Sequence, residues 1–436
     1  MLLALLSGCA SYFPVNDRME EWSKQGYRAS RRWSSDRSQE LLLVLAFSGG
    51  GTRAASFAYG VLEELESTPV TIDGRETTLL DEVDHISGVS GGSFPAAYFG
   101  LHGRGIFGDF EERFLKRNVQ RSLLIQLLWP WNWVLLFSPY FERSDLVARY
   151  YDRILFEKAT FADLEARPGP LVQINATDLA TGGPFSFIQE QFDFLCSDLS
   201  TYSISRAVSA SSAVPGPLSP LTLENYGGTC GFRPPDWIPE AIASGRSFGR
   251  AYVNARNLVS YGDSRRRRFV RLVDGGVSDN LAVRGPFEAD VLSKPQEGER
   301  AGRFPGVRWL VFILVNAATT PDTAWEEMDE APALMRIIDQ TATVQINRYS
   351  IETIELLRST FARWREVSAD WSEPAGFHLI ELDFTRHPDV AERRYLNRLP
   401  TSFHLEAAAV DRLRRAGRTI LRDSPAYAAF LEDLER

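Results

Sequence analysis

Apolar runs of strand length recur along the chain, and several of them lead into glycine-rich turns. Residues 41–47 (LLLVLAF) are apolar without alternation, which is typical of a strand buried on both faces. Apolar positions spaced as on one face of a helix follow in residues 55–65. Further strand candidates are residues 83–87, 171–177, 269–273, 308–315 and 376–382. Strands that alternate with helices predict an α/β fold with a mostly parallel sheet covered on both faces.

Two helices are predicted in the last third of the chain. One long helical region contains apolar positions between Leu334 and Trp364, and a second helix covers Leu405 to Arg422. No internal repeat accompanies these elements. The pattern is therefore that of a large α/β unit with additions at its C-terminal end.

Composition and charge narrow the range of functions. The chain has 436 residues, of which 44% are hydrophobic, so it can form a substantial core. Its 48 basic and 57 acidic residues give a net charge of −9, which disfavours nucleic acid as a partner. The three Cys and five His residues show no zinc-site spacing.

The N-terminus resembles a bacterial lipobox. Leu6-Ser7-Gly8-Cys9 follows an apolar run of six residues with no basic residue, so we expect the true start to lie upstream. Lipidation of Cys9 would anchor the protein to a membrane of the bacterial cell envelope, on its periplasmic or outer-membrane face. The alternative is a short apolar tail with an accidental cysteine. Residues 1–40 are expected to be a signal remnant and a polar tether.

An oxidising envelope would also affect the other two cysteines. Cys196 and Cys230 lie 34 residues apart in a stretch rich in loops, and they are candidates for a disulfide. The alternative is a pair of buried free thiols.

Gly88-Val89-Ser90-Gly91-Gly92 fits the G-x-S-x-G pattern at the end of a predicted strand. A nucleophilic serine on a sharp strand-to-helix turn needs neighbours with little or no side chain, and these glycines provide them. The helix that begins beyond Ser90 would favour negative charge near the hydroxyl group. An ordinary glycine-rich turn is the alternative.

The glycine run Gly49-Gly50-Gly51, with Thr52 and Arg53 after it, also joins a strand to a helix. Consecutive glycines leave backbone N–H groups uncovered at a helix start, which makes an anion site. In acyl transfer that anion is the oxygen of the tetrahedral intermediate. A phosphate loop is the rival, but the Walker and dinucleotide spacings are absent. A purely structural turn is the other alternative.

Asp274 ends an apolar strand and precedes Gly275 and Gly276. A partly buried carboxylate here could accept the proton of Ser90 directly, although Asp-Gly more often simply starts a turn. In an open parallel sheet the ends of the strands before Gly49, Ser90 and Asp274 would meet at one edge.

In this order, the three motifs resemble those of the patatin-like phospholipase family. A fourth segment, Ala210 to Pro215 with Pro220, resembles the proline-bearing motif of the family, and Leu399 to Phe403 resembles the tail of bacterial lipoprotein-like members. The resemblance implies a three-layer α/β/α fold, a catalytic domain over residues 41–287 and an extension over residues 288–436 that packs on the same core.

The resemblance also implies roles for individual residues. Ser90 would be the nucleophile and Asp274 the general base, without a catalytic histidine. Gly49, Gly50, Gly51 and Arg53 would form the oxyanion loop, with the N–H groups of Gly50 and Gly51 as donors. Ala54 stands where many members have glycine, which puts the detailed shape of this loop in question. The implied reaction is hydrolysis of phospholipid or another acyl-ester lipid through an acyl-enzyme, with no metal and no cofactor.

Two other functions stay open at this point. A histidine after Asp274 could complete a triad of the α/β-hydrolase type; the candidates are His378, His387 and His404. Alternatively, the protein could be an inactive envelope lipoprotein that binds lipid or a partner.

One further segment bears on membrane contact. Residues 123–141 are the most apolar stretch outside the strands, and Trp129, Trp131 and Trp133 suit a membrane surface. Proline and polar residues interrupt the stretch, so we do not expect it to span a bilayer. A lid or core helix is the alternative.

Overall fold

The structure is a computed structural model that describes residues 16–29, 37–129, 131–133, 142–215, 218–245, 249–285, 306–319, 334–369 and 375–436. Cys9, Pro130 and residues 134–141 therefore lie outside the described residues. None of the described helices is long and apolar enough to cross a bilayer.

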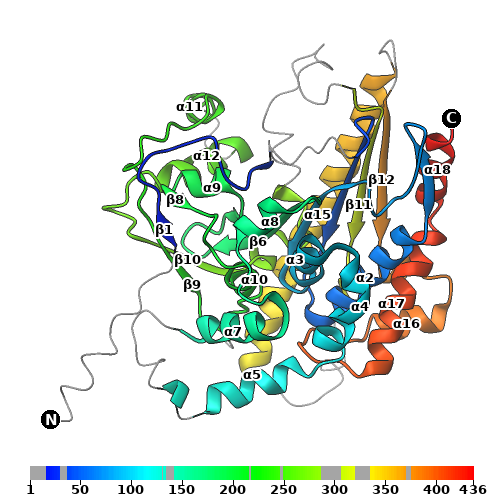
Figure 1. Cartoon of the computed structure of the whole chain (residues 1–436), viewed down its shortest axis with the longest axis horizontal. Coiled ribbons are helices and arrows are strands. Elements are labelled where there is room, and N and C mark those ends of the chain that lie inside the picture. The colour runs from blue at the N-terminus through cyan, green and yellow to red at the C-terminus, as the bar shows by residue number, and fades with distance from the viewer. Residues whose placement is uncertain are drawn as a thin grey trace.

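An eight-stranded sheet forms the centre of the molecule (Figure 1). Its strands, in spatial order, are β12 (Gly376–Leu382), β11 (Trp309–Val315), β2 (Leu41–Phe47), β5 (Val83–Val89), β6 (Leu171–Asp178), β10 (Phe269–Asp274) and β9 (Leu221–Glu224), and β7 (Pro184–Ser186) also pairs with β6. The strands from β12 to β6 are parallel to one another, whereas β7, β9 and β10 are antiparallel to their neighbours. The predicted α/β fold with a mostly parallel sheet is confirmed.

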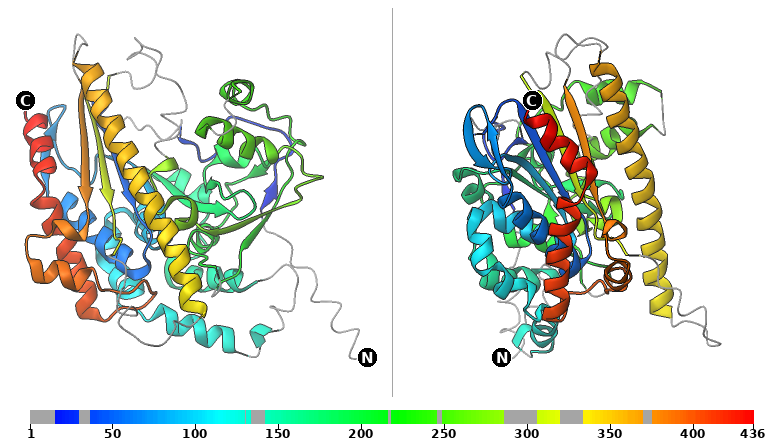
Figure 2. Two further views of the ribbon diagram at one scale, coloured as in Figure 1. Left: turned by 180° about the vertical axis from the view of Figure 1, so that it is seen from behind. Right: turned by 90° about the vertical axis from the view of Figure 1, so that its right-hand side faces the viewer.

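Helices cover both faces of this sheet (Figure 2). On β2, Leu43 and Leu45 face a large core with α2 (Gly51–Glu66), α3 (Ser93–His102) and α17 (Ala407–Arg422). Val44 instead faces a smaller core that includes Leu357 and Phe361 of the long helix α15 (Leu334–Ser368). Because alternate side chains of a strand point to opposite faces, the continuous apolar run in β2 supplies both cores. The result is three layers, α/β/α.

The other elements connect or flank these layers. The helices are α4 (Ile106–Phe110), α5 (Val119–Leu128), α7 (Arg143–Tyr151), α8 (Phe161–Ala166), α9 (Gln189–Asp193), α10 (Ile204–Ser211), α11 (Trp237–Ala243), α12 (Arg250–Ser260), α13 (Gly276–Asp279), α16 (Val390–Leu396) and α18 (Pro425–Leu434). Short 3₁₀ or π turns are η2 (Ser90–Gly92), η3 (Gly103–Gly105), η4 (Glu111–Leu115), η5 (Asp152–Phe156) and η7 (Phe384–Arg386). Small strand pairs are β1 (Asp17–Arg18) with β8 (Ser197–Asp198) and β3 (Pro69–Ile72) with β4 (Arg75–Thr78).

The C-terminal segment is built into the same core. It supplies β11 and β12 to the sheet, and α17 packs closely along α2. A Cβ atom on Gly60 would lie 2.1 Å from the carbonyl oxygen of Arg414, so the two helices touch through backbone at this point. Arg414 also forms a 2.6 Å ion pair with Glu63 of α2. The fold of the N-terminal motifs therefore depends on packing against the last third of the chain.

Residues 16–29, which lie within the segment expected to be a polar tether, pack on the domain. The Tyr27 side chain is fully buried, and its hydroxyl group donates a 3.1 Å hydrogen bond to the Val172 carbonyl oxygen. Arg28 forms a buried ion pair of 2.7 Å with Asp193. The stretch is polar overall, so its composition did not indicate that Tyr27 and Arg28 would be buried.

Candidate active site

The serine and the aspartate singled out in the sequence meet in the structure. Ser90 Oγ donates a 2.8 Å hydrogen bond to Asp274 Oδ2. Both residues are buried, with 6% of Ser90 and 8% of Asp274 exposed. The nucleophile candidate and a carboxylate that can accept its proton are thus in direct contact.

Ser90 stands on a sharp turn between β5 and α3. Its φ is 48°, in the left-handed region that residues with a Cβ seldom adopt, at a cost of about 1–3 kcal/mol. Glycines allow the surrounding backbone to close on it. A Cβ on Gly91 would lie 2.1 Å from the Gly51 carbonyl oxygen, and one on Gly92 would lie 2.5 Å from that of Phe47. The G-x-S-x-G pattern is therefore required by backbone contacts on the side of β2.

Asp274 reaches Ser90 by a route that the sequence pattern did not indicate. We expected a parallel strand, but β10 runs antiparallel to β6 and pairs Asp274 with Ala176. On the other edge of β6, Val89 pairs with Asn175. The last residue of β10 thus ends level with the last residue of β5, one strand away. β10 begins at the carboxyl edge of the sheet and pairs with only the last three residues of β6. Its own last residue, Asp274, therefore stays close to that edge and can meet Ser90.

The segment Ala210 to Pro215 contacts both the turn that holds Ser90 and the turn that follows Asp274. Ser211 Oγ accepts a 2.9 Å hydrogen bond from the Ser90 N–H group and donates one of 2.6 Å to the Asn175 carbonyl oxygen. The N–H groups of Asp274 and Gly275 donate to the carbonyl oxygens of Ala213 and Ser211, at 3.0 and 3.1 Å. One short segment therefore fixes the nucleophile turn relative to the base turn.

Burial alters the acidity of Asp274. Loss of hydration raises its pKa from 3.8 to about 6, although hydrogen bonds from the Gly276 N–H group, at 2.8 Å, and from Ser90 oppose that shift. A carboxyl group with this pKa is ionised at neutral pH and is a stronger base than an exposed aspartate. The electrostatics therefore suit proton transfer from Ser90.

The triple-glycine loop lies against the nucleophile turn. A Cβ on Gly49 would be 3.3 Å from Ser90 Cβ, and one on Gly91 would be 2.6 Å from Gly51 N. Gly50 and Gly51 have φ values of 138° and 58°, which favour glycine, and they precede or begin α2. Their N–H groups make no hydrogen bond to any residue that the structure describes. This arrangement can receive an anion beside Ser90.

Gly49 belongs to the glycine loop, but its N–H group already has a partner. Its N–H group donates a 2.9 Å hydrogen bond to the Asn280 carbonyl oxygen. The Asn280 carbonyl oxygen occupies this amide, so Gly50 and Gly51 remain the candidate donors.

The Arg53 side chain anchors the glycine loop through two backbone carbonyl oxygens of the C-terminal extension. Its Nε donates to the Ala317 carbonyl oxygen at 2.9 Å, and its Nη1 donates to that of Leu399 at 2.7 Å. Burial lowers the pKa of the guanidinium group to about 10. Arg53 thereby ties the start of α2 to two segments of the C-terminal extension.

No histidine takes part in this arrangement. All five lie in the described part of the chain, and none of them is hydrogen-bonded to Ser90 or Asp274 there. His378 Nε2 instead lies 3.0 Å from Asp433 Oδ2, and His387 Nδ1 accepts a 3.1 Å hydrogen bond from the Asp389 N–H group. The structure thus gives no support to a histidine-dependent triad.

Sequence reasoning missed Asn175, which supports the nucleophile turn from behind. Its Nδ2 donates to Ser87 Oγ at 2.9 Å and to the Gly88 carbonyl oxygen at 3.2 Å. The signal was present in β6, where Gln173, Asn175 and Thr177 alternate with apolar residues although the whole strand is buried. Polar side chains at alternate buried positions indicate a hydrogen-bonded network.

The structure joins Cys196 and Cys230 in a disulfide, with their Cα atoms 5.5 Å apart. It connects the turn before β8 to the loop after β9. Among the described residues, neither cysteine is hydrogen-bonded to Ser90 or Asp274.

Comparison with known proteins yields one family and several distant structural neighbours. A family model described as patatin-like phospholipase matches residues 45–287. A sequence comparison with curated proteins gives no match.

The structural neighbours are remote. Human GIVD cytosolic phospholipase A2 has a TM-score of 0.49 and 13% identity, over 93% of this chain and 64% of that one. The same human enzyme in complex with methyl gamma-linolenyl fluorophosphonate scores 0.40 at 13% identity, over 91% and 59%. VipD from Legionella pneumophila scores 0.28 at 11% identity, over 95% and 72%. The chain thus spans less than two thirds of the human enzyme.

Proposed function

Because the chain belongs to the patatin-like phospholipase family, we propose that it is a serine lipid acyl hydrolase that acts through a Ser90–Asp274 dyad. The observation that carries this proposal is the 2.8 Å hydrogen bond from Ser90 Oγ to a buried carboxylate. Beside it lie the N–H groups of Gly50 and Gly51, which donate to no residue in the described part of the chain. The family supports lipid hydrolysis in general, and the geometry supports the particular residues.

The reaction follows from the position of each group. Ser90 Oγ attacks the ester carbonyl carbon while Asp274 takes the hydroxyl proton. The N–H groups of Gly50 and Gly51 stabilise the oxyanion, each by about 3–4 kcal/mol of barrier. Collapse of the intermediate breaks the bond to the alcohol, which leaves with the proton from Asp274. Water then attacks the acyl-enzyme with Asp274 as base, and the free acid and Ser90 are regenerated.

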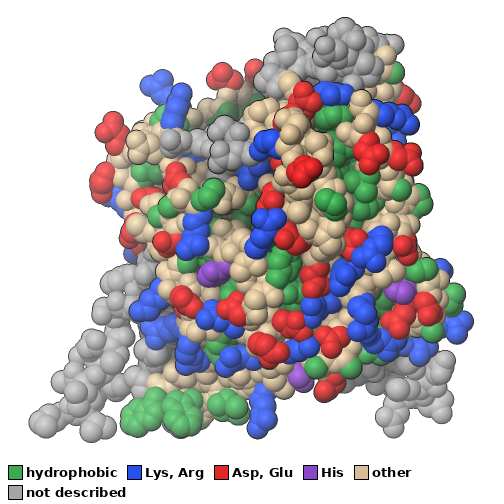
Figure 3. Space-filling model, turned by 45° about the vertical axis from the view of Figure 1, so that its right-hand side comes forward, with side chains coloured by type: hydrophobic (Ala, Val, Ile, Leu, Met, Phe, Trp, Pro, Cys, Tyr) green, Lys and Arg blue, Asp and Glu red, His purple; other side chains and the backbone are tan. Residues whose placement is uncertain are grey.

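We also propose that the enzyme works at a membrane surface through one exposed face. Six apolar side chains on and after α5, which we call the α5 patch, are each at least 50% exposed: Leu124, Ile125, Leu128, Trp129, Trp131 and Trp133. Hydrophobic side chains gather at the lower edge of the molecule in Figure 3, where Figure 1 places α5. Such a group of tryptophan and aliphatic side chains suits the interface of a bilayer.

Contacts along the chain support the closeness of this patch to the dyad. The Gln120 N–H group, at the start of α5, donates a 3.3 Å hydrogen bond to the Phe403 carbonyl oxygen. The neighbouring Ser402 accepts a 2.9 Å hydrogen bond from the Thr52 N–H group, directly after the glycine loop. A lipid bound at the α5 patch would therefore lie on the same side of the sheet edge as Ser90.

A lipid anchor on Cys9 would strengthen such membrane contact, and we propose an envelope location on that basis. Acyl chains on Cys9 and the α5 patch would then act together, because two apolar attachments hold a protein on a membrane more stably than one. Mass spectrometry of the mature N-terminus tests the anchor: a lipid-modified Cys9 supports it, and an unmodified Cys9 contradicts it.

The proposed function is tested with vesicles of mixed phospholipids. We expect the wild type to release free fatty acids and lysophospholipids, detected by mass spectrometry, and the Ser90→Ala variant to bind the vesicles without releasing either. Vesicle binding without acid release by the wild type would identify an inactive lipid-binding protein instead. Equal release by both proteins would exclude Ser90 as the nucleophile.

A further inference from the structure

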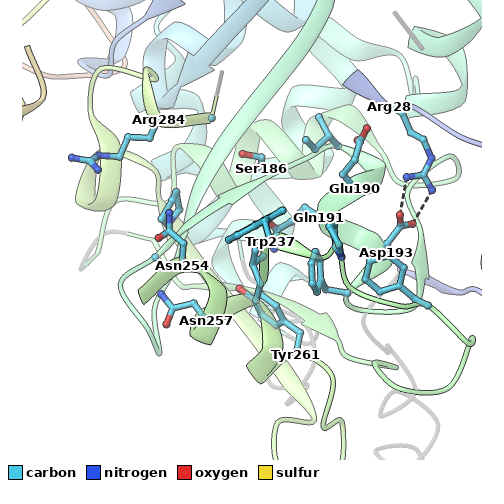
Figure 4. Close-up of a pocket in the computed structure, with 18 of the residues that line it drawn as sticks. Arg28, Ser186, Glu190, Gln191, Asp193, Trp237, Asn254, Asn257, Tyr261 and Arg284 are labelled. Atoms are coloured by element: carbon cyan, nitrogen blue, oxygen red, sulfur yellow. Dashed lines mark hydrogen bonds and ion pairs between the residues drawn. The ribbon is translucent and has the colours of Figure 1, made fainter. Parts of the chain in front are cut away.

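A cavity of about 590 Å³ lies apart from the dyad, between β7, α9, α11 and α12 (Figure 4). Its volume is within the range of small-molecule sites. Its wall is continuous with the large core, to which Phe194 and Tyr261 belong, and Gln173 of β6 lines it as well. Ser90 and Asp274 do not line it. The cavity is therefore not the acyl-binding part of the proposed active site.

Aromatic rings form much of the wall. Trp22, Phe194, Phe232, Trp237 and Tyr261 all line the cavity. Phe232 packs against Trp22 and Phe194, with ring centroids 5.9 and 4.9 Å apart. Such rings offer flat apolar faces to a ligand at little cost in conformational entropy.

The disulfide holds part of this wall in place. Cys196 follows Phe194 by two residues, and Cys230 precedes Phe232 by two residues, so the bridge between them fixes the two rings relative to each other. The Trp22 N–H group of the backbone donates a 2.9 Å hydrogen bond to the Cys230 carbonyl oxygen, which attaches the N-terminal segment to the same place. The wall is thus formed before any ligand binds.

Amide side chains face each other across the cavity. Figure 4 shows Asn254 and Asn257 of α12 on one side, Gln191 of α9 on the other, and the ring of Trp237 between them. The side chains of Gln191 and Asn257 make no hydrogen bond to another residue in the described ranges, and Gln191 Nε2 is buried without a partner. Gly183 leaves room for Asn257, because a Cβ there would lie 2.8 Å from Asn257 Nδ2.

The charged groups around the cavity favour an uncharged ligand. Arg28 is neutralised by Asp193 at 2.7 Å. Arg284 donates to Thr353 Oγ1 and lies 4.2 Å from the ring centroid of Tyr349, and in Figure 4 its guanidinium group points away from the centre of the cavity. Glu190 adds a carboxylate to the lining, which would repel an anion. Arg233, the remaining basic residue of the lining, is solvent-exposed.

We propose that this cavity binds a neutral sugar of one or two rings. A pyranose has apolar C–H faces that can pack on the ring of Trp237. Its hydroxyl groups both donate and accept, as do the amides of Asn254, Asn257 and Gln191. A hydrocarbon chain would remove the amides of Gln191 and Asn257 from water without giving them a partner, which is costly. The site adds a binding function to the proposed hydrolase and is independent of it.

The test is saturation-transfer difference NMR on the full chain with the methyl glycosides of glucose, galactose, mannose and N-acetylglucosamine, and with maltose. We expect saturation transfer to the ring C–H protons of at least one of these sugars. Trp237→Ala should abolish the signal, and Trp237→Phe should keep it because an aromatic face remains. Removing both amides in Gln191→Ala/Asn257→Ala should raise Kd at least tenfold. The matched control, Trp131→Ala, removes an exposed tryptophan from the α5 patch and should bind as the wild type does.

Thermal unfolding of each variant shows whether a loss of signal comes from a loss of fold. If the Tm of a variant is well below that of the wild type, Trp237→Phe/Asn257→Ala is measured in its place. The proposal is overturned if no sugar of the set binds at millimolar concentration. It is equally overturned if Trp237→Ala binds as the wild type does, or if octanoate or inorganic phosphate occupies the site in preference to the sugars. None of these results bears on hydrolysis at Ser90.

Discussion

The dyad and the α5 patch lie near the same edge of the molecule, but they are built in opposite ways. At the dyad, the side-chain groups of Ser90, Asp274 and Ser211 are buried and hydrogen-bonded, and glycines allow the backbone to close around them. At the α5 patch, by contrast, six apolar side chains are each at least half exposed to solvent. Burial sets the pKa of Asp274 and the position of Ser90, which the proposed reaction requires. Exposure allows the apolar side chains of the α5 patch to contact a membrane. Substitutions in the two regions should therefore have separable effects.

The largest separate effect on catalysis, without an effect on membrane binding, is expected for Asp274→Asn. Loss of the base should lower kcat for both vesicle lipids and a soluble short-chain ester by about 10²–10⁴-fold. Vesicle binding should not change, because the α5 patch is intact. A variant that retains full activity would remove Asp274 from the mechanism.

The same substitution should not lower stability at alkaline pH. The folded-state pKa of about 6 is above the unfolded value of 3.8, so this group stabilises the fold below about pH 3.8 and loses that contribution as the pH rises through about 6. Asn carries no charge to bury. We therefore expect a Tm at pH 8 equal to or higher than that of the wild type, measured by calorimetry.

The pH dependence of the wild type is the next effect in size. Because the base must be ionised, kcat/KM for the soluble ester should rise about tenfold per pH unit below about 6 and level off above it. No histidine should contribute a further step, and the single variants His378→Ala, His387→Ala and His404→Ala should keep the same profile. A flat profile across this range would contradict proton transfer to a buried carboxylate.

A smaller loss is expected from the brace between the two turns. Ser211→Ala removes the acceptor of the Ser90 N–H group, and we expect kcat to fall about 10–100-fold while KM changes little. The matched control is Ser359→Ala, at an exposed position of α15, which should behave as the wild type. Equal effects of the two substitutions would show that Ser211 does not position the nucleophile.

The smallest effect should come from the α5 patch and should appear with only one substrate. Leu128→Ser/Trp131→Ser should lower hydrolysis of vesicle lipids about tenfold by weakening membrane binding and leave the soluble ester unaffected. The control is Ile351→Ser/Val367→Ser on α15, which removes two comparably exposed apolar side chains elsewhere on the molecule. Equal losses on both substrates would show that the patch supports the fold instead.

Local sequence patterns were sufficient for the features that a short segment determines. A continuous apolar run identified β2, and a shorter strand candidate over residues 83–87 identified β5. The glycines after these two strands identified the turns that bring Ser90 and the glycine loop together. The sequence pattern could not predict the direction of a strand, because parallel and antiparallel strands can have the same apolar pattern. The prediction that β10 is parallel was therefore wrong, although Asp274 does lie next to Ser90.

Contacts between distant segments account for the other differences. Whether a glycine N–H group is free depends on which carbonyl oxygen approaches it, and Asn280 approaches Gly49 from more than 200 residues along the chain. Arg53 likewise binds carbonyl oxygens that lie beyond residue 316. No spacing rule within a motif contains this information.

The most direct test of the central claim is covalent labelling with a fluorophosphonate, located by peptide mass spectrometry. We predict one adduct, on Ser90, in the wild type; no adduct in Ser90→Ala; and labelling of Asp274→Asn that is slower by at least about a hundredfold. An adduct on another residue, or equal labelling rates for the wild type and Asp274→Asn, would contradict the assignment of a serine nucleophile that is activated directly by a buried aspartate.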